Sequence, residues 1–150
     1  MCNFCDYIAV MNQHPNLESC DPRQCISSRI LKCNRIISNV FRKHLLPYNI
    51  TNSQMSILFI VAKRGEATQQ ELATILYLEK STISRNMKRL FDGKLISKQN
   101  SKQIEITEAG KDFLEEIIPA WDEAMEESRA LLTAQGEEAL TILLNQLTHA

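Results

Sequence analysis

The residues whose types and spacing could do chemistry lie between positions 80 and 90. Apolar Ile83, Met87 and Leu90 recur at the spacing of one helix face. The other face carries hydroxyls and cations, namely Lys80, Ser81, Thr82, Ser84, Arg85 and Lys88. Hydroxyls can contact phosphates or base edges, and arginine can pair bidentately with guanine. The pattern indicates a helix that enters a major groove, and a basic face that contacts only solvent explains it equally well.

Cysteines form a second group with potential chemistry. All of them lie in the first 33 residues, at Cys2, Cys5, Cys20, Cys25 and Cys33. In a cytosolic protein, clustered cysteines favour metal or redox chemistry over a disulfide framework. The first four would suffice for a tetrahedral zinc site, but their spacing shows no paired knuckle, so no metal is assigned. Free thiols in an N-terminal arm, residues 1–20, are the simplest alternative, and Cys33 is expected in the core.

A second helix must support the helix at 80–90 and hold its polar face toward solvent. Thr68 and Glu71 have the spacing of a capping box, which predicts that a helix begins there. Residues 77–79 then provide a turn. Two short helices joined by such a turn form a helix-turn-helix, in which the second helix reads DNA.

Two short strands, residues 94–98 and 103–107, are expected directly after this unit, because polar and apolar residues alternate in the second. Lys98 and Lys102 flank the link between them. A basic hairpin in this position is a wing, which can follow a nucleic-acid backbone or enter a minor groove. The wing favours DNA binding over the solvent-face interpretation.

Helices are expected on both sides of the winged unit. Asp21 and Pro22 predict the start of a helix that runs to about Leu46. Thr51 and Gln54 form a second capping box, which opens an apolar core helix that stops before Gly65.

The C-terminal part predicts two more helices. Thr107 begins the first, which Pro119 should kink because proline removes a backbone donor. The second runs from about Ala134 to Thr148 with a leucine-rich face. These helices carry more apolar surface than the winged core can cover, which indicates a partner surface. A two-fold homodimer fits, because it would place two reading helices on successive turns of palindromic double-stranded DNA.

Length and charge agree with this organisation. The 150 residues suit one domain, and the net charge is −1. Between residues 80 and 102 the only acid among seven lysines and arginines is Asp92, whereas acids dominate after residue 111. The basic charge is therefore local to the candidate reading unit. No apolar run is long enough for a membrane span and no signal peptide is visible, so a cytoplasmic protein with no membrane partner is expected.

Enzyme motifs are absent from the sequence. It contains no GxSxG, phosphate loop or HExxH motif. Cys2 and Cys5 would need a βαβ setting to act as an oxidoreductase pair. We therefore expect no enzyme activity and no cofactor. Two alternatives remain, a winged-helix module that binds a protein rather than DNA, and a metal or redox sensor that uses the N-terminal cysteines. A steep salt dependence of DNA affinity would separate DNA binding from the protein-binding module.

The chain resembles the MarR-type transcriptional regulators from Asp21 to its C-terminus. The resembling stretches are TNSQMSILFIVAKRG, TQQELATILYLEKSTISRNMKRL, IEITEAGKDFL and LTAQGEEALTILLNQL. The resemblance implies a mainly α fold with a small β-wing. A winged helix-turn-helix over about 51–107 would lie between dimerisation helices over about 21–46 and 107–150. It also implies a homodimeric repressor that a small molecule or a redox signal releases from DNA.

The short wing is similar to that of one subgroup, which has a PxW motif after the wing and cysteines before the first helix. Pro119-Ala120-Trp121 and Cys25-Ile26-Ser27-Ser28-Arg29 carry this similarity. Many family members have a longer wing with a DxDRR-like run. That run is absent here, which leaves Lys98 and Lys102 as the wing cations.

The resemblance also implies roles for single residues. Ser81, Thr82, Ser84 and Arg85 would lie at the major groove, and Lys88 and Arg89 near the backbone, unless Arg89 pairs with Asp92 or Glu71. Thr68, Gln69 and Gln70 would hold a phosphate at the start of the first helix of the motif.

Two kinds of release signal follow from the resemblance. One branch of the family senses peroxide through a cysteine near the start of the first long helix. Cys25 lies close to that position, with Cys20 as a second thiol, and a helix start would lower the thiol pKa. Other members bind small anionic aromatics between the winged core and the dimer helices. The pocket candidates here are Arg29, His44, Tyr48 and Trp121, each of which could instead serve only in packing.

Overall fold

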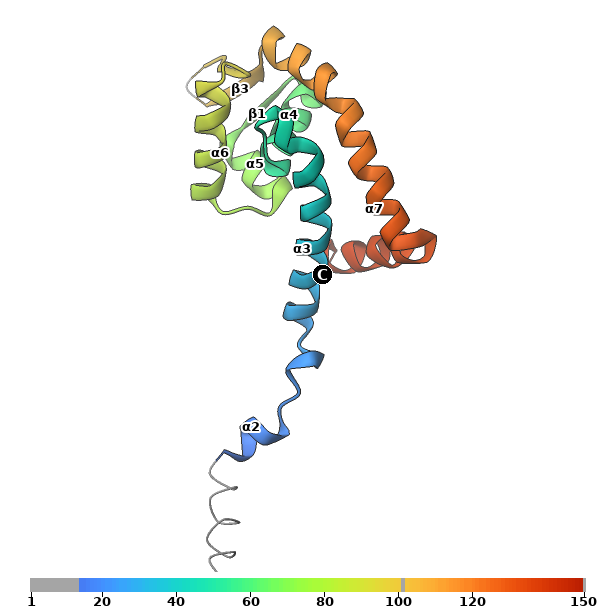
Figure 1. Ribbon diagram of the computed structural model, residues 1–150. Helices are drawn as coiled ribbons and strands as arrows, with labels where there is room; N and C mark the ends of the chain where they lie inside the picture. The colour runs from blue at the N-terminus through green and yellow to red at the C-terminus, as the bar shows by residue number, and fades with distance from the viewer. Residues whose placement is uncertain (1–13, 101, 150) are drawn as a thin grey trace, which may run out of the picture. The chain divides into compact units, whose positions relative to one another are not determined.

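The computed structural model describes residues 14–100 and 102–149. The elements in chain order are α2 (Pro15–Ser19), η1 (Pro22–Gln24), α3 (Ile26–Leu45), η2 (Leu46–Tyr48), α4 (Asn52–Arg64), β1 (Glu66–Thr68), α5 (Gln69–Leu76), α6 (Lys80–Asp92), β2 (Ile96–Lys98), β3 (Gln103–Ile106) and α7 (Glu108–Thr148) (Figure 1). The chain divides into two compact units, residues 1–36 and 37–150, and the second contains the winged helix-turn-helix. Among the described helices, none is both long and apolar enough to cross a membrane.

Helix α4 is the central helix of the second unit. The predicted capping box is confirmed, since Thr51 Oγ1 accepts from the Gln54 amide and Gln54 Oε1 accepts from the Thr51 amide. The helix ends at Gly65, whose φ of 84° suits a residue without a Cβ. Between these ends α4 buries Met55, Ile57, Leu58 and Val61. It packs against α5, α6, α7 and the sheet, so one apolar helix supports the whole reading unit.

Helices α5 and α6 form the predicted helix-turn-helix. Tyr77 ends α5 in the left-handed conformation, with φ 51° and ψ 40°, and the chain then turns into α6. Ile83, Met87 and Leu90 are buried, which confirms the predicted apolar back of α6. Its polar front is thereby left to solvent.

The sheet has three antiparallel strands in the order β1-β3-β2. β2 and β3 form the predicted wing, slightly shorter than expected. The first strand, β1, was not predicted, because three residues are too few to show an alternating pattern. Ala67 of β1 pairs with Ile104 of β3, and both are buried. This strand anchors the wing to the segment that enters α5.

Two expectations for the N-terminal unit are wrong. Asp21 caps a single 3-10 turn by accepting from the Arg23 amide, and the α-helix begins only at Ile26, because Cys25 has an extended ψ of 112°. Cys33 is exposed rather than part of the core. The other described elements within residues 14–36 are short, so they provide no second layer over the apolar stripe of α3.

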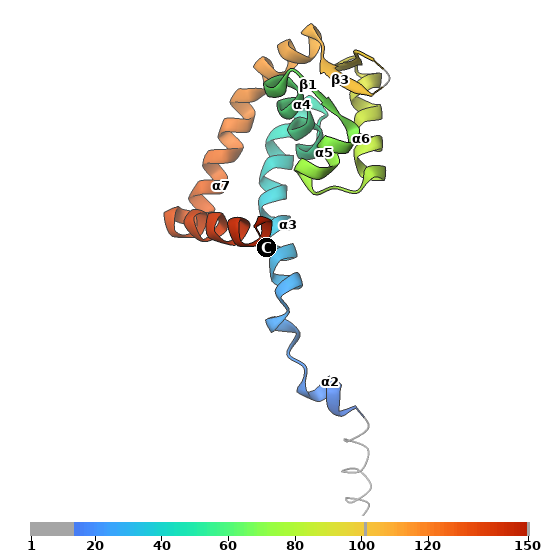
Figure 2. The same cartoon turned by 180° about the vertical axis from the view of Figure 1, so that it is seen from behind.

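The expected break in the C-terminal segment occurs at a different residue. Thr133, with φ 61° and ψ 169°, has non-helical dihedrals within α7, whereas the backbone stays helical through Pro119. Pro119 is exposed, as is Glu115 one turn earlier, so water can bond the carbonyl that proline leaves without a donor. Figures 1 and 2 show the sharp turn between the orange and red parts of α7. The predicted division into two helices is confirmed, but the kink is not at the proline.

The start of α7 is fastened to the loop that follows α6. Thr107 caps α7 by accepting from the Gly110 amide at 3.0 Å, and its hydroxyl donates to the Lys94 carbonyl at 2.7 Å. Its own amide donates to the Leu95 carbonyl at 3.1 Å. Gly110 lies so close to that carbonyl that a Cβ would overlap it. The reading helix and α7 are therefore joined through a tight junction (Lys94, Leu95, Thr107 and Gly110).

Candidate nucleic-acid interface

The front of α6 presents the residues expected to read DNA. Ser81, Ser84 and Arg85 are exposed, and Thr82 is half-buried. The apolar back of the helix fixes which side faces outward. Sequence reasoning therefore identified the exposed face correctly, and its contacts with DNA remain predictions.

Arg85 is held along its own helix. Its Nε donates to the Ser81 carbonyl at 3.4 Å and its Nη2 donates to Thr82 Oγ1 at 3.3 Å. Both bonds are long and exposed, so breaking them costs little free energy. They keep the guanidinium near the first two turns of α6, where the hydroxyls also lie. The arrangement could present a bidentate donor to a base edge.

The cations in the last turns of α6 differ from each other. Lys88 pairs with Asp92 at 2.7 Å, an exposed i,i+4 contact. Arg89 forms no ion pair with any residue that the structure describes. The two acids considered as its partners pair with other residues: Asp92 pairs with Lys88, and Glu71 pairs with Arg64 at 3.3 Å. Arg89 thus keeps an uncompensated charge at the end of the reading helix.

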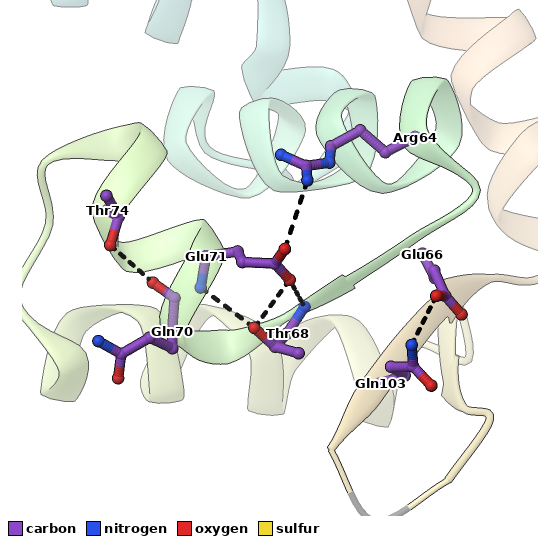
Figure 3. A network of polar contacts seen from close by, with 7 residues as sticks. All are labelled: Arg64, Glu66, Thr68, Gln70, Glu71, Thr74 and Gln103. Atoms are coloured by element: carbon purple, nitrogen blue, oxygen red, sulfur yellow. Dashed lines mark hydrogen bonds and ion pairs between the residues drawn. The ribbon is translucent and has the colours of Figure 1, made fainter.

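The start of α5 contains a polar network (Figure 3). Thr68 Oγ1 accepts from the Glu71 amide at 3.2 Å, and the Thr68 amide donates to Glu71 Oε2 at 2.7 Å, which confirms the capping box. These hydrogen bonds from Thr68, helped by Arg64, hold the pKa of the Glu71 carboxyl below its ordinary value. The network fixes the entry to α5 and ties it to the end of α4.

The three residues expected to hold a phosphate at this helix start have different environments. The Thr68 hydroxyl is committed to capping and also donates to Glu71 Oε2 at 2.8 Å. Gln69 Nε2 donates to the Lys80 carbonyl at 3.3 Å, which links α5 to α6. Gln70 is exposed. Of the three side chains, Gln70 is the one best placed for a phosphate.

The wing is stiffened by contacts that the sequence analysis missed. Asn100 Oδ1 accepts from the amides of Lys102 and Gln103, both at 2.9 Å. Gln103 Nε2 donates to Glu66 Oε1 at 2.5 Å, which joins β3 to β1 (Figure 3). Asparagine side chains in turns commonly accept hydrogen bonds from backbone amides a few residues later. The contacts of Asn100 could therefore have been predicted from the sequence. The contact of Gln103 with Glu66 could not have been predicted, because it depends on strand β1, which the sequence analysis missed.

The wing and the reading helix belong to one surface region. Strand β2 packs against α6, and the two lie side by side in Figures 1 and 2. Lys98 and Lys102 are exposed on the wing, as Lys88 and Arg89 are on the helix. The reading helix and the wing therefore each carry exposed cations, and their contact with one DNA surface remains a prediction.

The four residues expected to line an effector pocket have different surroundings. Trp121 packs edge-on against Phe59, with ring centroids 5.4 Å apart. His44 lies against α7, with its Nε2 2.8 Å from Glu127 Oε2 and its Nδ1 3.4 Å from Glu123 Oε2. Arg29 belongs to the other compact unit. Tyr48 lines a cavity beside the end of α6, with Arg42 and Arg89 among the other lining residues.

The contact of Glu127 with His44 predicts an acid-dependent loss of stability. Hydrogen bonds from His44 and then Lys43 hold the pKa of the Glu127 carboxyl below its ordinary value of 4.5. A lowered acid pKa stabilises the fold above the unfolded value, and this contribution disappears as the pH falls through the folded value. We expect Glu127→Gln to destabilise the protein at pH 7, with a difference from wild type that shrinks below pH 4.5.

Urea unfolding between pH 7 and pH 3 would measure that difference. Glu115→Gln is the matched control, because Glu115 is an exposed acid of the same helix with no ion pair to another described residue. A difference between Glu127→Gln and wild type that stays constant across this range would show that the carboxylate makes no net contribution through its charge.

The cysteines within the described residues are all exposed thiols, at Cys20, Cys25 and Cys33. Hydrogen bonds from the Ser28 hydroxyl and amide hold the pKa of the Cys25 thiol below its ordinary value. Cys2 and Cys5 lie outside the described residues. Within those residues, no three cysteine, histidine or acidic side chains gather as a metal site would require.

Comparison with known proteins places this geometry in a family. Residues 50–103 match the model of the MarR family. The chain is 26% identical over 114 residues to YwoH of Bacillus subtilis (strain 168), an uncharacterized HTH-type transcriptional regulator. That match covers 73% of this chain and 83% of YwoH.

Solved structures show the same fold. BpsR of Bordetella bronchiseptica superposes with a TM-score of 0.79 at 15% identity, over 87% of this chain and 98% of that one. A MarR variant from E. coli complexed with operator DNA superposes with a TM-score of 0.71 at 20% identity, over 81% and 92% of the two chains. Members of this family are transcriptional regulators and not enzymes. Residues 50–103 of this chain are therefore similar to the MarR family, and the chain has the winged-helix fold of the MarR-family structures.

Proposed function

We propose that this protein is a homodimeric repressor that binds palindromic double-stranded DNA and leaves it in response to a small molecule. The exposed front of α6 carries the proposal. It combines Ser81, Ser84 and Arg85 with a wing that adds Lys98 and Lys102. Hydroxyls and a guanidinium suit base edges, whereas the wing lysines suit the phosphate backbone.

The end of α7 supports a dimer. Beyond Thr133 one helix face carries Leu140, Leu143, Leu144 and Leu147, all exposed by 40–63%. Four leucines at this spacing form a continuous apolar stripe, which is costly to leave in water. A second copy of the chain would cover the stripe, because a two-fold interface pairs the same surface of both subunits.

Selection of binding sites from random duplex DNA by the full chain would test this function. We expect a recovered site with two-fold symmetry and half-sites about 10 base pairs apart. The stoichiometry should be two chains per site. Affinity should fall steeply with salt, because lysines and arginines displace counterions from phosphates.

Other results would point to other functions. A recovered site without internal symmetry would exclude the dimeric arrangement. DNA affinity that is weak and indifferent to sequence would favour the winged-helix module that binds a protein. A reporter gene placed behind the selected site should be silenced by the protein, and increased expression would mean an activator instead.

Two relatives of the same fold suggest the kind of release signal. The DNA binding of BpsR is regulated by 6-hydroxynicotinic acid. NadR, which superposes with a TM-score of 0.71, has been solved in complex with 4-hydroxyphenylacetate. Both molecules are small aromatic acids. We extend this class of effector to the present chain as part of the proposal.

A redox signal is the second candidate, and Cys25 favours it. This thiol is exposed and has a lowered pKa, so a larger share of it is the reactive thiolate at neutral pH. In this alternative, mild oxidation of Cys25 rather than a ligand would release the DNA. Operator binding measured with reduced and oxidised thiols would separate the two signals.

The hydrogen bonds of Ser28 make the reactivity of Cys25 testable. We expect Ser28→Ala to slow the alkylation of Cys25 by iodoacetamide at neutral pH, because the thiolate loses the Ser28 hydroxyl, its largest donor, and keeps only the backbone amides. Mass spectrometry of the labelled peptides gives the rate for each cysteine. Alkylation of Cys33 is the internal control and should stay unchanged. An unaltered rate at Cys25 would mean that Ser28 does not stabilise the thiolate.

A further inference from the structure

A short network of polar side chains connects strand β1 to the turn of the wing. Gln103 Nε2 donates to Glu66 Oε1 at 2.5 Å (Figure 3), and Asn100 Nδ2 donates in turn to Gln103 Oε1. Asn100 Oδ1 then accepts from the backbone amides of Lys102 and Gln103, both at 2.9 Å. We call the side chains of Glu66, Gln103 and Asn100 the Glu66 network.

The backbone of Glu66 is held from both sides. It follows Gly65, where the central helix α4 ends, and precedes Ala67, which is buried and pairs with the buried Ile104. The Glu66 carboxylate is therefore attached to the core of the reading unit, whereas Asn100 lies in the link between β2 and β3. A two-stranded hairpin is only marginally stable by itself, so the wing depends on contacts with its neighbours.

The carboxylate sets the orientation of both amide groups in the network. An ionised carboxylate can only accept, so Gln103 must turn its NH₂ group toward Glu66. The Gln103 oxygen then faces Asn100, which must also present its NH₂ group. The Asn100 oxygen is left facing the wing turn, where two backbone N–H groups need an acceptor. One carboxylate at position 66 thus fixes which atom of Asn100 meets the backbone.

Strand pairing alone gives no reason for an acid at position 66. Glu66 lies directly opposite Glu105 of β3, and like charges in this arrangement destabilise a sheet. The two acids have different partners, because Ser97 Oγ donates to Glu105 Oε1 at 3.1 Å. Glu66 instead reaches its diagonal neighbour Gln103, whose opposite residue is Thr68. The contribution of Glu66 is therefore to the wing turn rather than to the pairing of β1 with β3.

The wing lysines lie at the far end of the network. Lys98 ends β2, and Lys102 directly precedes β3. Both are exposed, and neither forms an ion pair with another residue that the structure describes. Asn100 holds the Lys102 amide, and the Gln99 amide closes the hairpin by donating to the Gln103 carbonyl at 3.0 Å. The network thus holds the backbone of the wing while the two charged side chains stay exposed.

We propose that Glu66 is a positioning residue of the DNA interface. Through Gln103 and Asn100, its carboxylate holds the wing in the shape in which the wing lysines meet the phosphate backbone. This role rests on the proposed function, in which the wing contacts DNA. It makes DNA binding depend on an acid, although charge alone would predict that an acid near the wing weakens binding.

Two lysine substitutions separate the geometry of the network from its charge. Glu66→Lys and Glu105→Lys make the same change of charge at directly opposite positions of one sheet. Lysine only donates, so at position 66 it would reverse the amides and turn the Asn100 NH₂ group toward backbone N–H groups. At position 105 the Ser97 hydroxyl can change from donor to acceptor, which makes Glu105→Lys the matched control. Glu66→Gln is the conservative variant, because its amide oxygen can still accept from Gln103.

Hydrogen exchange of backbone amides, followed by NMR on the DNA-free full chain, measures the wing itself. In Glu66→Lys we expect the amides of Lys102 and Gln103 to exchange about two- to tenfold faster, because each loses its acceptor. Exchange in Glu105→Lys and in Glu66→Gln should stay at the wild-type rate.

Affinity for the selected DNA measures the consequence of wing shape. Charge alone would strengthen binding equally in the two lysine variants. We expect Glu66→Lys to bind about two- to tenfold more weakly than Glu105→Lys, with a shallower salt dependence, because the wing lysines displace fewer counterions. Glu66→Gln should bind at least as tightly as wild type.

Equal exchange rates and equal affinities in the two lysine variants would overturn the proposal. Fast exchange in Glu66→Gln would also overturn it, because the effect would then come from the lost charge. Faster exchange in Glu66→Lys without weaker DNA binding would show that wing shape does not matter for binding and would remove Glu66 from the interface. The expected exchange pattern without any selectable DNA site would instead refute the proposed function and leave the effect of the network on the wing in place.

Discussion

Replacing Arg85 with alanine is expected to weaken specific DNA binding by about 1–3 kcal/mol, which is about 5- to 150-fold in affinity. The side chain is exposed on the front of α6 and lies near Ser81 and Thr82. Its bonds to these residues are weak enough to exchange for a base edge. Losing it would remove a bidentate contact that discriminates one base pair from another.

Competition binding with the selected site and with single-base variants of it would measure this effect. The loss should be largest on the preferred site, so that discrimination at one position of each half-site relaxes. Lys63→Ala is a suitable control, since Lys63 is an exposed cation at the end of α4, outside the proposed interface. A loss that is uniform across all DNA sequences would make Arg85 a phosphate contact instead.

Local sequence rules predicted the reading unit well because its determinants are local. Both capping boxes join residues three positions apart, and the apolar back of α6 repeats at helical spacing. The turn between α5 and α6 was correct for the same reason. Such signals lie within a few residues of sequence and do not depend on the rest of the fold.

The features that sequence reasoning missed depend on distant partners. Strand β1 exists because Ala67 pairs with Ile104, far along the chain. The contact of Gln103 with Glu66 follows from that pairing. The cavity lined by Arg42, Tyr48 and Arg89 requires α3, α4, α6 and α7 together, so no local pattern in the sequence could predict it.

The errors in the flanking helices have a common physical origin. Asp21 and Pro22 are correct signals for a helix start, but here they begin one 3-10 turn. Pro119 is a correct signal for a lost hydrogen bond, yet the exposed position tolerates that loss. In both cases the local signal was read correctly. Its structural effect, a full helix start or a kink, depended on the residues around it.

The junction between α6 and α7 also borders the cavity beside the end of α6. Leu95 belongs both to this junction and to the lining of the cavity, and Phe113 on the first turns of α7 lines the same cavity. The exposed leucines of α7 begin further along the helix. The cavity is therefore adjacent to the residues that join α6 to α7.

Replacing Gly110 with alanine is expected to destabilise the protein by about 1–3 kcal/mol or more, as overpacking of a tight site does. A Cβ at this position would overlap the Leu95 carbonyl oxygen and crowd Ile106. The carbonyl belongs to the backbone and already accepts from the Thr107 amide, so it cannot move aside cheaply. Chemical and thermal unfolding would report the loss.

Gly136→Ala provides the matched control on the same helix. Its Cβ would meet Leu132 Cβ at 3.4 Å and no backbone atom, so alanine should leave stability unchanged or raise it through its higher helix propensity. If Gly110→Ala folds, its α6 should be displaced at the junction, and DNA affinity should fall more than stability alone explains. Wild-type stability in Gly110→Ala would show that the loop after α6 relaxes freely around the added Cβ.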